Sequence, residues 1–232
     1  MRILLVAVVS HSPEVFNLGI IALDGYVLIL RGDRILDFID GLSTNLVDGN
    51  CTTVFTTKNA KIIDMVEIIP IGELVAVVGY GPYKDQILSH LTAKILGSKI
   101  TIGDASDSNQ VMLSTEDINL GTSITKVKTF RGWLLIGPKD KCPKENLTKE
   151  QFDEYRVNNI IPHQGHEITQ NVHPLSCGLG HLVHENKGCY IGQEILARMR
   201  SRGRQGKRLI RIENPAEDAT TIGETHSLAI RR

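Results

Sequence analysis

The sequence predicts an α+β fold, in which short strands and hairpins are interspersed with a few helices. Apolar runs of strand length flank the turn sequence Asp24-Gly25, a strong local hairpin signal. Apolar residues at helical spacing mark residues 81–97 as a helix. From residue 160 to residue 186 the periodicity is lost and His, Gly and Pro become frequent, which predicts a long functional loop.

The composition is that of a soluble globular protein. Hydrophobic residues make up 41% and charged residues 22%, so we expect a sizeable core in one large domain or one domain with an appendage. Lys+Arg and Asp+Glu both number 26, so the net charge does not indicate a polyanionic partner. No apolar segment has the length that spans a bilayer, and the apolar run at residues 3–9 suits a buried strand better than a signal peptide.

The cysteines indicate a reducing, cytosolic compartment rather than a disulfide framework. They are widely spaced and none forms a C-x-x-C pair. Their positions are Cys51, Cys142, Cys177 and Cys189.

Local patterns predict the elements of the first third in order. Asp24-Gly25 favours a tight hairpin turn because glycine adopts positive φ at low cost. Residues 32–42 are expected to be helical, with Asp33 near the cap position. A second hairpin is expected over residues 52–69, turning at Lys58-Asn59.

The middle of the chain continues with strands and one clear helix. Residues 73–79 are typical of a short buried strand. Pro82 suits the start of the helix over residues 81–97, and Gly97 suits its end. Two further strands are expected on either side of Gly132.

After residue 140 the pattern changes again. Thr148 and Gln151 form a plausible capping box for a short helix that runs through Arg156. Helical spacing resumes over residues 189–200, after the long loop.

The expected domain organisation is a main α+β region over residues 1–205, followed by a short β segment over residues 206–232. Two strands, residues 207–213 and 226–232, make up this segment. It is too small to fold alone, so we expect it to pack on the main region.

The long loop and its surroundings contain residues that could bind a metal. Cys177, His181, His184 and Cys189 carry the nitrogen and sulfur ligands that zinc prefers. Their spacing matches no standard structural zinc pattern, and histidines in such a loop commonly bond backbone carbonyls instead. We therefore expect no metal and keep Cys177, His181 and His184 only as weak candidates.

Cys189 lies in the octapeptide KGCYIGQE, and two interpretations of it stay open. Gly188 lets the backbone approach a ligand, and a helix beginning near Tyr190 would point its amides at the sulfur. With Lys187 adjacent and Arg198 nearby, this setting would favour the thiolate. The alternative is a small apolar side chain packed beneath the loop.

Two other features have open alternatives. The basic stretch over residues 198–211 could be a solvated surface, an RNA contact, or a site for a small polyanion. Asn45, in the turn GLSTNLVDG, could bond the edge of a heterocycle or only its own turn backbone.

KGCYIGQE resembles the K-G-C-[FY]-x-G-Q-E signature of the YgfZ-type proteins, a branch of the folate-binding superfamily that includes the glycine cleavage T-protein. Four further segments resemble superfamily motifs in the family order, so the resemblance covers about residues 20–212. These segments are RGDRILDFIDGLSTNLVDG, VFTTKNAKIIDMVEI, YRVNNIIPHQGHEI and HPLSCGLGHLV.

The resemblance implies a T-protein/YgfZ-like α+β fold around a central folate pocket, with a C-terminal β unit shorter than the usual family barrel. It also implies a cytoplasmic role in assembling or maintaining iron–sulfur clusters, including those of tRNA-modifying enzymes. The implied partners are tetrahydrofolate or another folate, iron–sulfur client or assembly proteins and, through the basic stretch, tRNA. The alternatives are folate-dependent aminomethyl transfer and an RNA-binding accessory module.

The same resemblance assigns roles to individual residues. Cys189 is the candidate functional thiol. The implied folate-binding residues are Asn45, Arg156, Ser176, Lys187, Tyr190, Gln193, Glu194 and Arg198.

Three positions differ from the family pattern. Leu46 and Asn158 stand where the family has acids. Ser176 stands where the T-protein branch has the carboxylate that faces the pterin ring. A serine hydroxyl gives a weaker, uncharged hydrogen bond than a carboxylate does.

Overall fold

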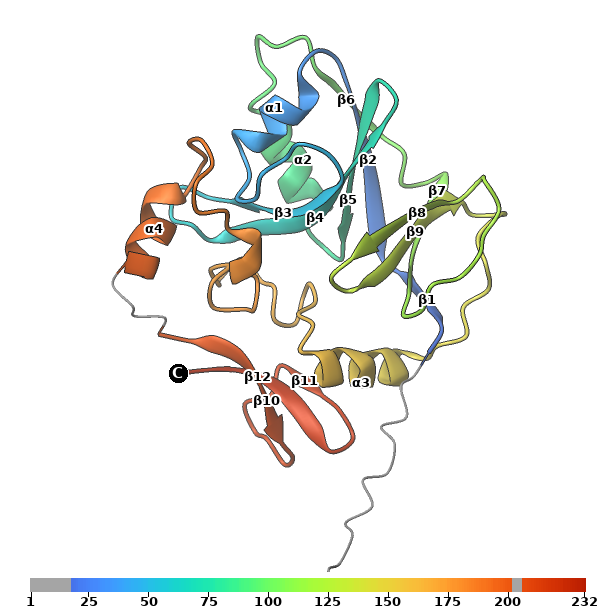
Figure 1. Cartoon of the computed structure of the whole chain (residues 1–232), viewed down its shortest axis with the longest axis vertical. Helices are drawn as coiled ribbons and strands as arrows, with labels where there is room; N and C mark the ends of the chain where they lie inside the picture. Colours follow the sequence, from blue (N-terminus) through green and yellow to red (C-terminus); the bar gives the residue numbers. More distant parts are fainter. Residues whose placement is uncertain (1–17, 202–205) are drawn as a thin grey trace, which may run out of the picture.

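Three antiparallel sheets and four α-helices make up residues 18–201 and 206–232, the part of the chain that the computed structural model describes (Figure 1). This arrangement confirms the α+β class. The strand expected at residues 3–9 lies outside the described residues. In the described ranges, no helix combines the length and apolar character needed to cross a membrane.

The largest sheet has five strands in the order β3-β4-β5-β2-β6. These strands are β2 (Gly25–Arg31), β3 (Cys51–Thr56), β4 (Ile62–Ile71), β5 (Leu74–Tyr80) and β6 (Thr101–Asp104). The short helices α1 (Ile35–Asp40) and α2 (Lys84–Thr92) cover one face of this sheet (Figure 1). Ile39 and Ile87 on these helices share a buried apolar cluster with alternate strand residues such as Leu28.

The second sheet has four strands in the order β1-β7-β9-β8 and packs on the other face of the first. Its strands are β1 (Ile20–Leu23), β7 (Asn109–Ser114), β8 (Thr125–Thr129) and β9 (Gly132–Pro138). Apolar side chains of both sheets, such as Val78 and Leu134, form the core between them. Phe152 of α3 (Lys149–Asn159) joins the same core.

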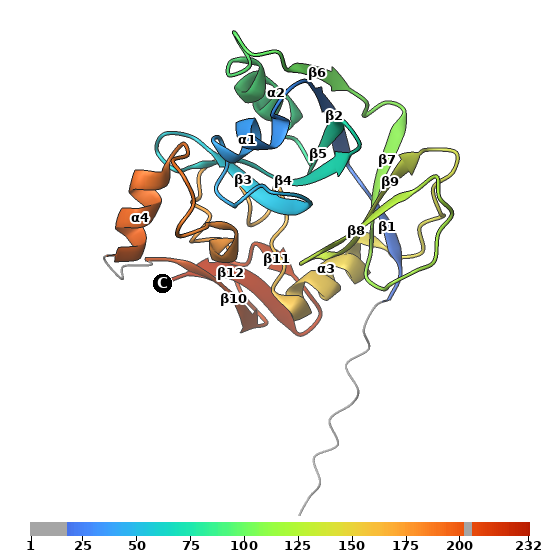
Figure 2. The same ribbon diagram turned by 45° about the horizontal axis from the view of Figure 1, so that its top comes forward.

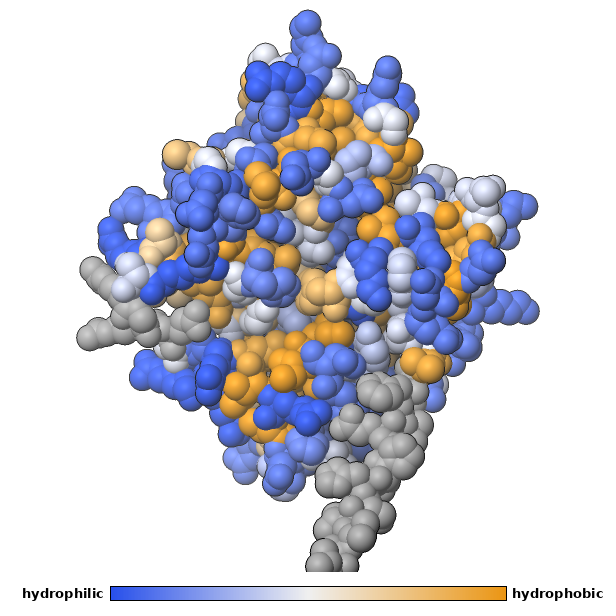
Figure 3. Space-filling view, in the orientation of Figure 1, coloured by the Kyte–Doolittle hydropathy of each residue, from blue (hydrophilic) through white to orange (hydrophobic). Residues whose placement is uncertain are grey.

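A small third sheet lies beside α3 in both ribbon views (Figures 1 and 2). Its strands, in the order β10-β12-β11, are β10 (Arg208–Glu213), β11 (Thr221–Ile222) and β12 (His226–Arg231). Leu209 and Leu228 of this sheet pack with Val157 of α3. Figure 3 shows apolar residues gathered on the lower part of the molecule, where Figure 1 places this sheet.

The predicted hairpin at Asp24-Gly25 is wrong. β1 pairs with β7, whereas β2 pairs with β5 and β6, so the chain leaves one sheet at Asp24 and enters the other. A Cβ atom on Gly25 would lie 2.5 Å from Cβ of Val111. The glycine is therefore required by the close approach of the two sheets, and not by a hairpin turn.

Other local predictions are confirmed. β3 and β4 form the hairpin expected around Lys58-Asn59, and β8 and β9 flank Gly132. The capping box of α3 is present: Thr148 Oγ1 accepts from the Gln151 amide at 3.2 Å, and Gln151 Oε1 accepts from the Thr148 amide at 2.9 Å.

Helix boundaries differ from the predictions where apolar spacing extends beyond the helix. α1 begins at Ile35 after Arg34, and Asp33 does not cap it but pairs with Lys99 at 3.6 Å. α2 is shorter at both ends than residues 81–97. The long loop contains one 3-10 turn, η1 (Gly180–Leu182), and is followed by α4 (Gln193–Ser201).

Candidate functional site

The octapeptide KGCYIGQE leaves the long loop and runs into α4, and buried contacts hold it on the five-stranded sheet and its connections. The first contact is Lys187, whose side chain is fully buried. Its ammonium group donates to Asp40 Oδ1 at 2.8 Å. It also donates to the backbone carbonyls of Asp40 at 2.7 Å, Ser43 at 3.0 Å and Asn45 at 2.6 Å. Burial lowers the pKa of Lys187, and the bond to Asp40 opposes this shift.

The second contact is Tyr190, which packs in a buried cluster with Ala60 and Leu196. The ammonium group of Lys187 lies 5.5 Å from the centre of its ring, within cation–π range. The aromatic ring is therefore part of the protein core, and its two neighbours in that core belong to the β3–β4 turn and to α4.

The third contact is at Gly192, where the chain passes close to the β3–β4 turn. Thr56 Oγ1 donates to the carbonyl of Ile191 at 2.6 Å. A Cβ atom on Gly192 would lie 2.7 Å from Thr56 Oγ1 and 2.8 Å from the carbonyl oxygen of Thr57. Gly192 also has φ of 87°, in the left-handed region. Both the space and the backbone conformation therefore require glycine.

We expect Gly192→Ala to lower the free energy of unfolding by about 2–4 kcal/mol, from the overlap and the left-handed backbone together. Gly188→Ala is the matched control, because a Cβ atom there has nothing within 4 Å. Urea denaturation of both variants measures the difference. Equal stability of the two variants would contradict the assignment of Gly192 as a contact point.

Cys189 lies between the first two of these contacts and is exposed. It forms no hydrogen bond or ion pair with any other residue in the described ranges. The predicted helix start near Tyr190 is wrong, because α4 begins at Gln193, four residues after Cys189. Arg198 pairs with Glu194 at 2.8 Å, and both side chains are largely exposed. The structure thus presents the thiol to solvent on a firmly held loop.

The other implied folate-binding residues are not gathered into one pocket. Arg156 is fully buried and pairs with Glu167 at 3.0 Å and Asp153 at 2.7 Å. Asn45 bonds the carbonyl of Thr52 at 2.9 Å, and its side-chain oxygen accepts from the Leu46 amide, so its amide group serves its own turn.

Two of the remaining implied residues face a second region. Tyr190 and Gln193 line a pocket of about 390 Å³ between the end of the long loop and α4. Arg200 also lines it, but donates to the carbonyls of Gly180 and Val183, both at 2.8 Å. Ser176 is half-buried in the long loop.

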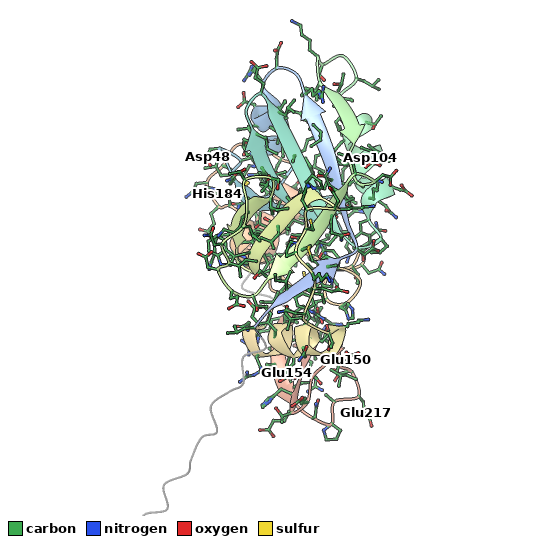
Figure 4. All side chains as sticks on the ribbon, turned by 90° about the vertical axis from the view of Figure 1, so that its right-hand side faces the viewer. Asp48, Asp104, Glu150, Glu154, His184 and Glu217 are labelled. Atoms are coloured by element: carbon green, nitrogen blue, oxygen red, sulfur yellow. The ribbon has the colours of Figure 1, made fainter. Side chains whose placement is uncertain are left out.

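The weak metal candidates do not converge. Within the described part of the chain, no group of three or more His, Cys, Asp or Glu side chains is placed to hold a metal ion. Cys177 is buried and lies 3.6 Å from the carbonyl of His173. His181 packs against Phe130 at 4.9 Å, and His184 Nδ1 accepts from the Asn186 amide. Figure 4 shows His184 well apart from the labelled acids of α3.

The sequence analysis missed a polar network buried between the sheets. Asp64, in β4, is fully buried and bonds the Tyr26 hydroxyl, the Gln164 amide at 3.1 Å and its neighbouring backbone amide. Burial raises its pKa to about 7, although these hydrogen bonds act in the opposite direction. The signal in the sequence was an acid within the apolar run KIIDMVEII.

Arg131 extends the same network from the β8–β9 turn. It donates to Gln164 Oε1 at 3.3 Å and Glu67 Oε1 at 3.2 Å, and its guanidinium lies 3.9 Å from the centre of the Tyr80 ring. The network therefore joins both large sheets to the beginning of the long loop. Among the described residues, Arg131 Nε and the Tyr80 hydroxyl have no hydrogen-bond partner.

We expect Asp64→Asn to stabilise the protein relative to wild type, by an amount that grows as the pH rises. The folded-state pKa lies above the usual value of 3.8, so the stability from holding this proton is complete below about pH 4 and is lost as the pH rises through about 7. Asparagine keeps the shape and does not ionise. Urea denaturation at about pH 5 and about pH 8 tests this, and a gap that shrinks with pH would contradict it.

Comparison with known proteins adds the fold. No protein-family model and no curated protein sequence matches the chain. Among solved structures, it is similar to glycine cleavage system aminomethyltransferase T from Bartonella henselae, with a TM-score of 0.67. The match covers 86% of this chain and 67% of that one at 10% sequence identity. At this identity the likeness establishes a T-protein-like fold.

Proposed function

We propose that the protein supports the assembly or maintenance of iron–sulfur clusters, in the manner of the YgfZ-type proteins, and that Cys189 is its functional thiol. The observation that carries this proposal is the division of labour within KGCYIGQE. Lys187, Tyr190 and Gly192 hold the segment on the protein, whereas Cys189 is exposed between them.

The chemistry of the thiol fits such a role. Cysteine thiolates are the ligands of iron–sulfur clusters and the reactive form in sulfur exchange. Burial raises the pKa of the Cys51 and Cys177 thiols to about 12, which disfavours their thiolates. An exposed thiol on a held loop can meet a client or assembly protein directly. Enzymes that modify tRNA are among the clients we propose.

We expect Cys189→Ser to abolish the ability of the protein to restore iron–sulfur enzyme activity in cells that lack it. Serine keeps the shape but is a far poorer sulfur and metal ligand. Cys142→Ser is the matched control, because Cys142 lies outside the octapeptide and is half-buried. Restoration by Cys189→Ser as complete as by wild type would sink the proposal.

Folate, as tetrahydrofolate or another folate, is the cofactor that the resemblance suggests. The residues do not form a ready folate cradle, because Asn45, Arg156 and Lys187 use their polar groups within the protein. Ser176 supplies a hydroxyl where a carboxylate would accept paired donors. We derive no chemical step through folate and keep it as a ligand to be measured by calorimetry with tetrahydrofolate.

The second candidate function is folate-dependent aminomethyl transfer, favoured by the structural likeness to an aminomethyltransferase. It requires tetrahydrofolate binding and turnover that survives Cys189→Ser, which separates it from the first proposal. An RNA-binding role is favoured less, because Arg200 of the basic stretch is occupied by Glu185 at 3.2 Å and by backbone carbonyls.

A further inference from the structure

A second cleft lies on the side of the five-stranded sheet that the helices cover. It has a volume of about 750 Å³ and runs between α2 and the β3–β4 hairpin, with Gln170 of the long loop at its edge. Its lining includes Ile62 and Ile63, the first residues of β4, which are buried. Side chains of α2 four residues apart, Gln86 and His90, face it from one side of the helix.

The polar groups that line this cleft are largely unused by the protein. Asn59, Gln86 and Gln170 carry primary amides, and none of the three forms a hydrogen bond with another described residue. Each amide offers a donor and an acceptor side by side. An apolar base with a few free polar groups at its margin is the usual composition of a small-molecule site.

His90 supplies an independent observation. It lines the cleft, and its Nε2 atom is buried without a hydrogen-bond partner among the described residues. Its ring contacts the edge of Phe55, with ring centres 5.8 Å apart. Burial, together with Lys94, lowers the pKa of His90, so the ring is neutral near pH 7. A buried polar atom left without a partner calls for a ligand or water to complete it.

The charges of the cleft limit the class of ligand. Lys61 and Asp85 are its two charged lining residues, and their charges balance. One N–H of Lys61 already donates to the carbonyl of Asn171 at 2.6 Å. The cleft therefore lacks the clustered cations that a phosphate would require.

We propose that this cleft binds an uncharged, planar heterocycle of the nucleobase type, presented as a free nucleoside. The apolar residues and the His90 ring would contact its faces, and the amides of Asn59, Gln86 and Gln170 would bond its edge. Paired donors and acceptors on asparagine and glutamine match the edges of bases such as adenine. The inference does not depend on Cys189, which does not line this cleft.

The test is calorimetric or NMR titration of the full chain with adenosine, guanosine, cytidine and uridine at millimolar concentration. At least one nucleoside should bind, and Gln86→Ala should weaken it about two- to tenfold, as expected for one lost hydrogen bond. Asn159→Ala, an exposed amide on α3, is the matched control and should leave the affinity unchanged.

Three results would overturn the proposal. They are no binding of any nucleoside, equal weakening by Gln86→Ala and Asn159→Ala, and much tighter binding of the 5′-monophosphate than of its nucleoside. The last would show that an anion site, and not the amide rim, governs binding. Because Gln86 is exposed on the helix surface, Gln86→Ala should fold normally, and circular dichroism verifies this.

Discussion

Arg156→Met is expected to lower the free energy of unfolding by about 3–5 kcal/mol, because it leaves the buried carboxylate of Glu167 without its cation. The guanidinium is fully buried and also bonds Thr221 Oγ1 at 2.9 Å and the Ile161 carbonyl at 3.3 Å. Methionine fills part of the volume and replaces none of these bonds. Urea denaturation measures the loss, with Arg198→Met, a largely exposed arginine, as the control.

The same variant tests our proposal that residues 206–232 form a short β segment packed on a main region of residues 1–205. Arg156 lies on α3 and Thr221 on β11, so this contact ties the small sheet to the helix. In Arg156→Met, amide hydrogen exchange should rise first in β10, β11 and β12. Uniform exchange over the whole chain, with unchanged stability, would contradict both expectations.

Lys187→Met is expected to cost about 3–5 kcal/mol, since it removes the cation from a buried site lined by acceptors. The carbonyls of Ser43 and Asn45 would lose their bonds to the ammonium, as would the carboxylate of Asp40. Lys207→Met removes an exposed lysine and is the control. The midpoint of urea unfolding gives the comparison.

Lys187→Met also has a consequence for the thiol. With the first contact point lost, the segment around Cys189 should move more, and iron–sulfur enzyme activity should fall even at temperatures where the variant stays folded. A variant as stable as Lys207→Met would show that the buried ammonium contributes little.

Short-range signals in the sequence predicted the local structure well. Thr148 and Gln151 identified the start of α3, because both partners of a capping box lie within four residues. The turn at Asp24-Gly25 has equally strong local chemistry, yet the strands on either side belong to different sheets. Which strand pairs with which depends on contacts such as Gly25 with Val111, which no short pattern contains.

The candidate site shows the same limit. The octapeptide drew attention to Cys189, and the structure places that thiol at the surface. The sequence could not show that Lys187 and Arg156 are consumed by internal bonds, because their partners lie elsewhere in the chain. Asp64 was missed for a related reason: its partners Tyr26 and Gln164 are 38 and 100 residues away.

The bond between Lys187 and Asp40 spans 147 residues, and this has a consequence for how the protein folds. The five strands of the large sheet are complete by Asp104, so a ribosome could release them well before Lys187 is made. Until then the carbonyls of the α1–β3 connection have only water as their partner. Contacts between such distant residues form slowly, because a long loop must close first. We therefore expect the Cys189 segment to be ordered late in folding, after the sheets that support it.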